Sequence, residues 1–491
     1  MQREMQHKNL FSNPPRWVEN AIVYQIFPDR FRCSGRVGAD QHWALQPWGS
    51  APSPQGFHGG DLYGVIEALD YLEQIGINCI YLNPIFSSAA NHRYHTFDYF
   101  QVDPLLGGNC ALDALISALH SRGMRIVLDG VFNHCGRGFW AFHNLLENGE
   151  ASPYRDWFCV HKWPLVPYPK SEQDCGYSCW WNDAALPKFN HQHLPVREYL
   201  ISVASYWVER GIDGWRLDVP DEVPLDFWVD FRKKVKEINS NTWIVGEIWG
   251  DARKWLEDGY FDGVMNYRVG WSSLSWAGQN KLRKSYLNPA YPLNEIGGDD
   301  FIDVINTTFG WYSNIVNKSQ MNLLDSHDVP RALNTLKGDI PSLKIAICLL
   351  FFQPGAPCIY YGTEVGLSGG EEPACRECFP WEESWNVDLR AFIHSLVDLR
   401  KNFSELSNGG VRWKSIGENG LYGSLNRLDN LDSKTENSIA IFINRSSSSW
   451  LPIETPSKKY VFLEGKVDCH ERSLAPQSVV IFKGSSGGDP S

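Results

Sequence analysis

Four apolar stretches of the sequence end in ionisable side chains or are followed closely by them. These side chains are Asp129 and His134, Arg216 and Asp218, Glu247, and His327 with Asp328. Paired carboxylates can hydrolyse a glycosidic bond: one attacks the anomeric carbon, the other protonates the leaving oxygen, and in a retaining enzyme they stand about 5 to 5.5 Å apart. This chemistry requires the four stretches to converge in space.

Each of these residues has a structural interpretation when it is taken alone. An Asp at the end of a strand commonly caps the next helix or pairs with a cation, and a His in a loop is commonly just hydrogen-bonded. Several carboxylates, an arginine and two histidines gathered at four strand ends would, however, repel and desolvate one another. A site that breaks the rules of folding in this way is expected to be functional.

The spacing of Arg216 and Asp218 suggests how such a site would be tuned. A nucleophilic carboxylate must stay ionised, and a neighbouring cation favours the ionised form. The second carboxyl group must stay protonated, which a like-charged neighbour favours. We therefore expect Arg216 to keep Asp218 ionised and oriented for attack.

Short segments rich in β-branched and aromatic residues recur along the chain, with helical patterns at residues 61–76, 111–123 and 224–238 between them. The strand-like segments are residues 21–27, 78–82, 124–129, 212–218, 242–247, 261–267, 321–326 and 356–361. Alternating strands and helices predict an α/β fold, here a (β/α)8 TIM barrel formed by residues 1–135 and 191–404. Catalytic residues of such barrels lie at the C-terminal ends of the strands, where the four stretches place theirs.

Two regions depart from the barrel pattern. Residues 136–190 are rich in Trp, Tyr, Pro and Cys and show no clear helical period, which predicts a subdomain inserted after the third strand. From residue 405 to residue 491 the pattern changes to short alternating strands bounded by Gly, Ser and Asn, which predicts an antiparallel β-sandwich.

Composition excludes several classes of partner. The formal net charge is −12, which argues against nucleic acid and anionic membranes as partners, because phosphate binding needs a basic face. The longest apolar runs are far shorter than the roughly 20 residues that span a bilayer, and the N-terminus lacks the pattern of a secretory signal. We therefore expect a cytoplasmic protein. The 13% aromatic content, with 21 Trp, suits the apolar faces of sugar rings as well as core packing.

The twelve cysteines are too sparse for a disulfide scaffold, so we expect reduced thiols. The pairs Cys175/Cys179 and Cys375/Cys378 have spacings that a metal could use, but neither has a second pair or a His pair beside it. We expect no cofactor and no metal.

The motifs DGVFNH, GWRLDV, GEIW and SHD, in this order, resemble the four best-known sequence regions of the α-amylase family of glycoside hydrolases. The resemblance implies that the Asp of RLD is the nucleophile, the Glu of GEIW the acid/base, and the Asp after His a stabiliser of the transition state. The implied catalytic residues are Asp218, Glu247 and Asp328, and the implied sugar-binding residues are Tyr94, His134, Arg216 and His327, with Asp129, Glu222 and Trp381 added to the substrate-binding set.

Finer features resemble one branch of that family. LPKFN at 186–190 is similar to the MPKLN signature of the neopullulanase, cyclomaltodextrinase and maltogenic amylase group, and residues 358–381 resemble that group's eighth-strand loop. Glu222 matches a group position near the acceptor subsites. Trp140, Trp180, Trp181 and Trp381 are candidate sugar platforms, with core packing as the alternative interpretation.

Two features depart from the group. Its members usually begin with a separate β-domain, whereas here the barrel pattern begins about twenty residues into the chain, so we expect that domain to be missing and leave the oligomeric state open. The segment RCSGRVG, which in many relatives is a calcium loop, lacks carboxylates, and Asp221 and Glu222 replace the Lys-His pair of calcium-bound α-amylases. Both differences favour a protein without calcium.

The resemblance implies a retaining hydrolase of α-glucosidic bonds in maltooligosaccharides, cyclodextrins, pullulan or branched glucans, with α-1,4 cleavage, α-1,6 cleavage and transglycosylation. One alternative is an enzyme that acts mainly on α-1,6 branch points, since a missing N-terminal domain would open the mouth of the barrel. A second is an inactive carbohydrate-binding scaffold, which the presence of all three acids argues against. A third, a metal-dependent hydrolase, lacks the multi-His ligand set it would need.

Overall fold

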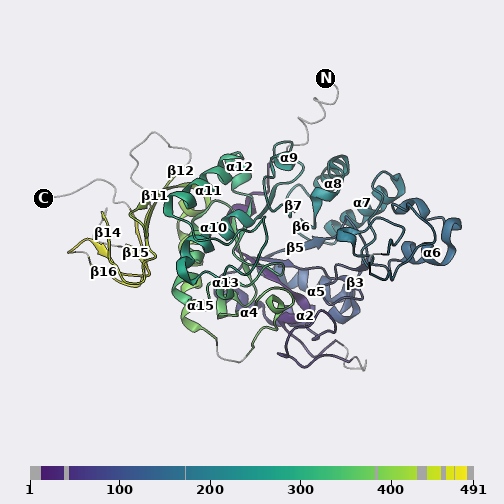
Figure 1. The fold of residues 1–491 in the computed structure, drawn as a ribbon, viewed down its shortest axis with the longest axis horizontal. Coiled ribbons are helices and arrows are strands. Elements are labelled where there is room, and N and C mark those ends of the chain that lie inside the picture. Colours follow the sequence, from purple (N-terminus) through teal and green to yellow (C-terminus); the bar gives the residue numbers. More distant parts are fainter. Residues whose placement is uncertain are drawn as a thin grey trace, which may run out of the picture.

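The computed structural model describes residues 13–37, 44–171, 173–381, 385–427, 439–454, 460–468 and 470–483. Eight parallel strands close into a barrel in the middle of the molecule (Figure 1). In chain order they are β1 (Val23–Ile26), β2 (Cys79–Leu82), β5 (Arg125–Gly130), β6 (Gly214–Leu217), β7 (Trp243–Gly246), β8 (Gly263–Asn266), β9 (Met321–Leu323) and β10 (Ala356–Tyr360). Each segment that the sequence predicts as a barrel strand coincides with one of them, with β5 extending one residue beyond its segment, and this confirms the predicted barrel.

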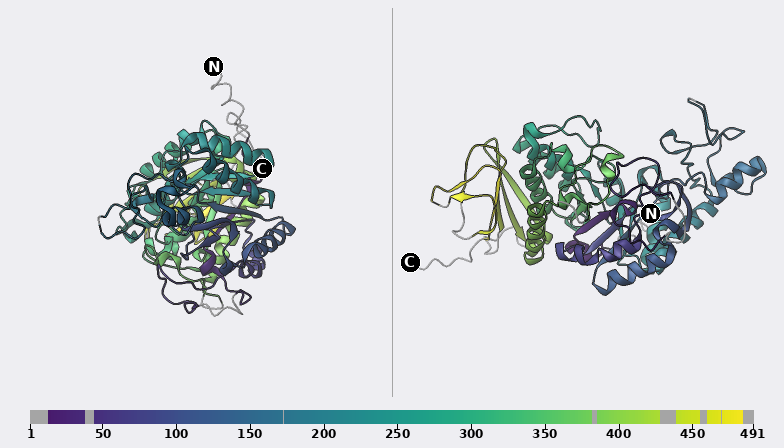
Figure 2. Two further views of the ribbon diagram at one scale, coloured as in Figure 1. Left: turned by 90° about the vertical axis from the view of Figure 1, so that its right-hand side faces the viewer. Right: turned by 90° about the horizontal axis from the view of Figure 1, so that it is seen from below.

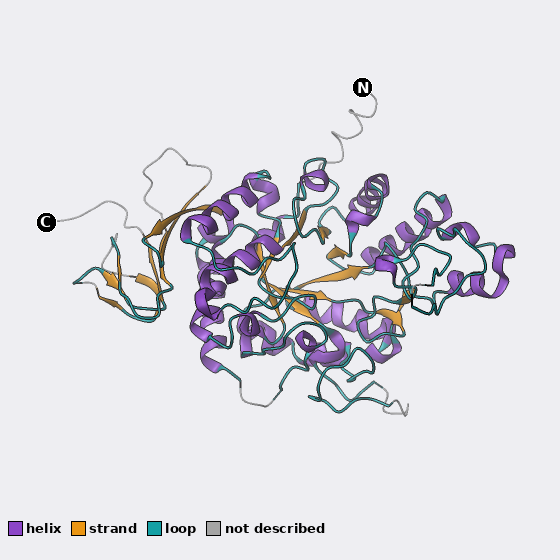
Figure 3. Ribbon diagram, in the orientation of Figure 1, coloured by secondary structure: helices purple, strands orange, loops and turns teal. Residues whose placement is uncertain are grey.

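Helices surround the barrel (Figure 3). The main ones are α3 (Leu62–Glu67), α4 (Leu69–Ile75), α5 (Gly108–Ser121), α7 (Leu194–Glu209), α8 (Leu225–Ile238), α10 (Tyr267–Gly278), α11 (Gly298–Gly310), α14 (Ile340–Phe352) and α15 (Val387–Asn402). The single helix predicted over residues 61–76 forms two, because Ala68, at φ −92° and ψ 0°, ends α3 and precedes α4. Within the described ranges, no helix is both long and apolar enough to cross a membrane.

The register of strands β5, β6 and β7 places polar side chains side by side at one end of the barrel. Asp129 in β5 pairs with Arg216 in β6, and Leu217 in β6 pairs with Gly246 in β7. Because these strands run parallel, Asp218 and Glu247, which directly follow β6 and β7, leave the barrel at the same end. Two apolar strands that differ in sequence thus deliver their terminal carboxylates to one place.

The chain between β5 and α7 projects from the barrel at the end of the molecule opposite the C-terminal domain (Figures 1 and 2). It contains the predicted insertion, residues 136–190. A helix, α6 (Trp140–Asn148), forms there and buries Ala141, Phe142 and Leu145, although no helical period was expected. Its nine residues are fewer than the window of about 11 to 18 residues in which such a period becomes visible.

The C-terminal domain contains two antiparallel sheets. The larger has the order β11 (Gly409–Ile416), β12 (Gly420–Arg427), β13 (Ile439–Asn444), β18 (Ser478–Lys483) and β15 (Tyr460–Glu464), and the smaller has the order β14 (Leu451–Pro452), β17 (Ser473–Leu474) and β16 (Val467–Asp468). Phe442 and Phe482 of the larger sheet share a buried cluster with Leu451 and Leu474 of the smaller one. The two sheets therefore enclose a core between them, as a β-sandwich does. Residues 484–491 of the predicted domain lie outside the described residues.

Candidate active site

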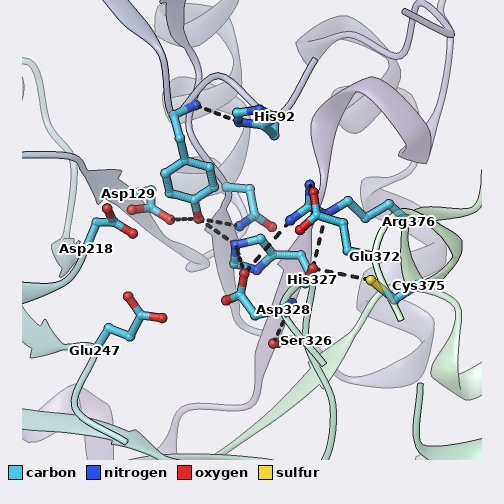
Figure 4. A network of polar contacts seen from close by, with 12 residues as sticks. His92, Asp129, Asp218, Glu247, Ser326, His327, Asp328, Glu372, Cys375 and Arg376 are labelled. Atoms are coloured by element: carbon cyan, nitrogen blue, oxygen red, sulfur yellow. Dashed lines mark hydrogen bonds and ion pairs between the residues drawn. The ribbon is translucent and has the colours of Figure 1, made fainter. Parts of the chain in front are cut away.

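Arg216 lies at the centre of a cluster of buried carboxylates. Its Nη1 donates to Asp129 Oδ1 at 3.0 Å and to Asp218 Oδ1 at 2.9 Å, and its Nη2 forms an ion pair with Glu247 Oε1 at 3.0 Å. The arginine and these three acids are all buried. Figure 4 shows the carboxylates of Asp218, Glu247 and Asp328 turned toward one shared space. One guanidinium thus holds the two residues that the sequence predicts as nucleophile and acid/base.

Asp129 fixes the position of that guanidinium. Its carboxylate accepts hydrogen bonds from Tyr81 Oη at 2.6 Å and Tyr94 Oη at 3.0 Å, in addition to those from Arg216. Tyr81 belongs to β2, which pairs with β5, so the hydroxyl and the carboxylate come from adjacent strands. The acid is therefore fully hydrogen-bonded and its role is to orient Arg216.

His327 connects Tyr94 with the third acid. Gln25 Nε2 lies 2.9 Å from His327 Nδ1, while Tyr94 Oη and Asp328 Oδ1 lie 2.6 and 3.1 Å from its Nε2. The rings of Tyr94 and His327 also stack, with centroids 5.5 Å apart and planes within 4°. Burial, Arg376 and Arg216 hold the pKa of His327 well below its usual range, so the ring is neutral.

The loop after β10 fixes the backbone of His327 through hydrogen bonds to its carbonyl oxygen. Arg376 Nε and Cys375 Sγ donate to the carbonyl of His327 at 3.0 and 3.3 Å, and Arg376 Nη1 pairs with Glu372 at 2.6 Å (Figure 4). Arg376 Nη2 also lies 3.9 Å from Asp328 Oδ1. Cys375, one of the cysteines whose spacing resembles a metal motif, thus acts as a hydrogen-bond donor.

Glu247 is held by two donors from its own side of the barrel. The backbone N–H of Val219 donates to Oε2 at 3.1 Å, and Trp249 Nε1 donates to Oε1 at 3.2 Å. Val219 has a φ of 35°, a left-handed conformation that β-branched residues rarely adopt. The indole of Trp249 stacks on Tyr267 at 3.8 Å with planes within 6°. Backbone strain and ring stacking both orient the acid.

Burial favours the protonated forms of Asp218, Asp129 and Asp328. Burial raises the pKa of Asp218 well above its usual range, Arg216 opposes this shift, and Glu247 and Asp129 reinforce it. Burial likewise raises the pKa of Asp129, and it raises that of Asp328 to about 7. Arg216 thus lowers the pKa of Asp218 as the sequence suggests, but burial has the larger effect. Asp328 therefore keeps its proton at pH values below about 7.

The remaining predicted binding residues have different surroundings. His134 is buried, burial lowers its pKa to about 3, and its Nε2 has no hydrogen-bond partner among the described residues. Glu222 pairs with Lys188 Nζ at 2.9 Å. Trp381 donates its indole N–H to the carbonyl of Phe31 and packs in an aromatic cluster, with Arg32 over its ring at 4.7 Å. The contacts of Trp381 are those of a packed side chain rather than of a free sugar-binding face.

Several residues of the site escaped the sequence analysis. They are Gln25, Tyr81, Lys188, Val219, Trp249 and Arg376. Four of them lie inside stretches that the sequence analysis quotes as family or group features, without a role assigned to them: Val219 in GWRLDV, Trp249 in GEIW, Lys188 in LPKFN and Arg376 in residues 358–381. Gln25 is a polar residue in the middle of an otherwise apolar strand, and Tyr81 lies in a strand whose pattern fits packing equally well.

Comparison with known proteins identifies the fold family. The model of the α-amylase catalytic domain matches residues 25–405. A cyclomaltodextrinase of Geobacillus thermopakistaniensis is 38% identical over 455 residues, covering 91% of this chain and 73% of the relative. An intracellular maltogenic amylase of Bacillus subtilis is 38% identical over 424 residues, covering 86% and 68%. The crystal structure of a debranching enzyme from Nostoc punctiforme superposes with a TM-score of 0.85 at 39% identity, covering 96% of this chain and 99% of that one.

These matches confirm the resemblance of the four motifs and of the finer group features. They extend over the barrel, whose strand ends carry the cluster around Arg216, and the structural match covers nearly the whole chain. The chain belongs to the α-amylase family of glycosidases.

Proposed function

We propose that this protein is a retaining hydrolase of α-glucosidic bonds in maltooligosaccharides, cyclodextrins, pullulan or branched glucans. One observation carries the proposal: a single buried guanidinium, that of Arg216, contacts both Asp218 and Glu247. A shared cation keeps two carboxylates from adjacent strands within reach of one sugar ring, as a double-displacement mechanism requires.

In this mechanism Asp218 Oδ attacks the anomeric carbon while Glu247 gives its proton to the departing glycosidic oxygen. A covalent glycosyl ester on Asp218 forms as the C–O bond breaks. Glu247 then removes a proton from water, which attacks the same carbon and releases Asp218. An acceptor sugar in place of water would give transglycosylation, and the Lys188–Glu222 pair, 2.9 Å apart, is proposed to contact that acceptor.

Two buried atoms support a sugar ligand at this site. Oδ2 of Asp328 and Nε2 of His134 have no hydrogen-bond partner in the part of the chain that the structure describes. Buried polar atoms are nearly always hydrogen-bonded, so atoms like these are suited to a ligand rich in hydroxyl groups. We assign Asp328 to the stabilisation of the transition state, His134, His327 and Arg216 to the sugar at the cleavage point, and Tyr94 to stacking under it.

The relatives support two specificities. Similarity to a cyclomaltodextrinase supports α-1,4 cleavage as the main activity of this protein. Similarity to the debranching enzyme of Nostoc punctiforme, which covers 96% of this chain, supports a second candidate, an enzyme that cleaves mainly α-1,6 bonds. The similar maltogenic amylase of Bacillus subtilis is intracellular by name, and we propose that this protein likewise acts in the cytoplasm.

The product profile on pullulan tests both candidates. Pullulan joins maltotriose units through α-1,6 links, so panose marks α-1,4 cleavage and maltotriose marks α-1,6 cleavage. The Asp218→Asn protein is the blank, and its rate is expected to fall by roughly four orders of magnitude or more while the fold is kept. The proposal would be contradicted if neither panose nor maltotriose rose above the blank, or if Asp218→Asn kept near-normal activity.

A further inference from the structure

A stack of three aromatic rings runs from the candidate active site to the surface of the inserted segment. The ring of Trp180 lies over that of His134, with centroids 5.5 Å apart and planes 23° apart. Trp181 stacks on Trp180 in turn, at 4.7 Å and 11°. His134 is 1% exposed, whereas Trp181 is 80% exposed. The stack thus begins at a buried histidine that follows β5, the strand of Asp129, and ends with an indole in solvent.

The turn that carries Trp181 is strained and firmly closed. Trp181 and Asn182 both have positive φ, 46° and 59°, in the region that residues with a β-carbon rarely occupy. The turn is closed by hydrogen bonds from Trp180 N to Leu186 O at 3.0 Å and from Asp183 N to Trp180 O at 2.9 Å. Such strain persists only where the surrounding structure enforces it, and it gathers at ligand-binding sites.

Packing does not account for this conformation. An indole that only filled the core would turn both faces inward, whereas Trp181 is 80% exposed and, among the described residues, stacks on Trp180. Tyr168, also exposed in the inserted segment, differs because the guanidinium of Arg137 lies over its ring at 4.0 Å. Trp181 therefore presents a preformed apolar surface that a ligand can cover.

We propose that Trp181 is a binding platform for a glucose unit of a long or branched α-glucan, beyond the sugar that is held at the cleavage point. The occupant follows from continuity, because the stack starts at His134, the residue proposed above to bind the sugar at the cleavage point, whose buried Nε2 has no hydrogen-bond partner among the described residues. The C–H face of a glucose ring is apolar and matches an indole face, while its hydroxyl groups stay in water. This inference rests on the proposed function, since it assigns part of the same substrate.

The test compares long and short substrates in Trp181→Ala and in Trp450→Ala. Trp450 is 45% exposed and belongs to the C-terminal domain, at the opposite end of the molecule, so it serves as the matched control. For Trp181→Ala we expect kcat/KM on maltoheptaose to fall about 3- to 10-fold, mainly through KM, with little change on maltotriose. Trp181→Phe should keep most of the activity, and Trp450→Ala should behave as the parent.

Binding to the inactive Asp218→Asn protein separates this inference from the proposed function. Calorimetry with maltoheptaose should show the same 3- to 10-fold loss of affinity when Trp181→Ala is added. An unchanged KM and Kd for maltoheptaose, an equal loss on maltotriose, or no binding of maltoheptaose by Asp218→Asn would overturn the platform. The proposed function alone would be contradicted if the unaltered protein hydrolysed no glucan while Trp181→Ala still lowered the affinity for maltoheptaose.

Discussion

Arg216 Nη1 donates to both carboxylate oxygens of Asp129, at 3.0 and 3.1 Å, and neither side chain is exposed to solvent. The two residues are register partners on adjacent strands β5 and β6. Asp129 thereby turns the guanidinium toward the barrel mouth, where it meets Asp218 and Glu247. Asp129, to which the proposed mechanism assigns no chemical step, thus sets the geometry and the charge around the proposed nucleophile and acid.

Asp129→Asn should shift the pH dependence of activity. Asp129 raises the pKa of Asp218 by charge repulsion, so its neutralisation lowers that pKa. Because Asp218 must be ionised to attack, the acidic limb of kcat/KM should move to lower pH, while the rate at the optimum falls about 10- to 100-fold from the loss of Arg216 orientation. Asp262→Asn, which removes another buried acid that is paired with an arginine, serves as the control and should leave the limb in place. An acidic limb that stays or moves upward in Asp129→Asn would contradict this account.

Asp328→Asn should stabilise the protein, and more so as the pH rises. Burial raises the pKa of Asp328 to about 7, from a usual value near 4, so between these values the folded state holds a proton that the unfolded state has released. The free energy of unfolding therefore falls as the pH rises from about 4 to about 7. The variant lacks this loss and should gain roughly 1 to 3 kcal/mol at pH 8 and little at pH 4. Urea unfolding at the two pH values measures the difference, and an equal gain at both would show that ionisation is not the cause.

Gln25→Leu should impair catalysis through the tautomer of His327. Gln25 Nε2 donates to Asn83 Oδ1 at 3.1 Å and lies 2.9 Å from His327 Nδ1, so the neutral ring carries its proton on Nε2, facing Asp328. Without that donor the ring is free to take the other tautomer, and we expect kcat to fall about 10-fold or more with a smaller change in KM.

The ¹⁵N shifts of His327 report this tautomer directly, with His327→Asn used to assign the signal. A purely structural role for Gln25 would lower the melting temperature and leave the shifts unchanged. Gln25→Glu provides a second check, because a carboxylate accepts a hydrogen bond from Nδ1–H and should therefore favour the tautomer protonated on Nδ1 more strongly than Leu does.

The barrel and the convergence of the acids could be predicted from the sequence, because both follow from local patterns. Runs such as MRIVLD and TWIVGE show strand character, and parallel strands in a barrel deliver their C-terminal residues to one end. The partners of these acids depend instead on contacts far apart in the chain. Gln25 and His327 are 302 residues apart, and no periodicity links them.

Local conformation set a second limit on prediction. The positive φ of Val219 and of Trp181 occurs at residue types that disfavour it, so propensity pointed away from the turns that form. The exposure of Trp181 likewise opposes the usual preference of Trp for burial. Val219 donates to Glu247, and Trp181 ends a ring stack that begins at His134, so both deviations involve residues of the proposed site or its proposed extension, where function can outweigh local preference.

Removal of calcium with a chelator should leave the melting temperature of the protein unchanged. The carboxylates near the segment RCSGRVG already accept hydrogen bonds or ion pairs from donors of the protein. Asp61 accepts hydrogen bonds from Gly64 N at 2.8 Å and from both Ser34 N and Ser34 Oγ at 2.9 Å, and Asp29 is bound by Arg30 Nε at 2.8 Å. A hard cation would have to displace these donors. Melting curves with EDTA and with added calcium should therefore coincide, whereas Asp61→Ala should lose about 1 to 2 kcal/mol as the cap of α3 and the tie to Ser34 are removed. A large drop in melting temperature with EDTA that calcium reverses would mean that calcium, and not Asp61, holds this loop.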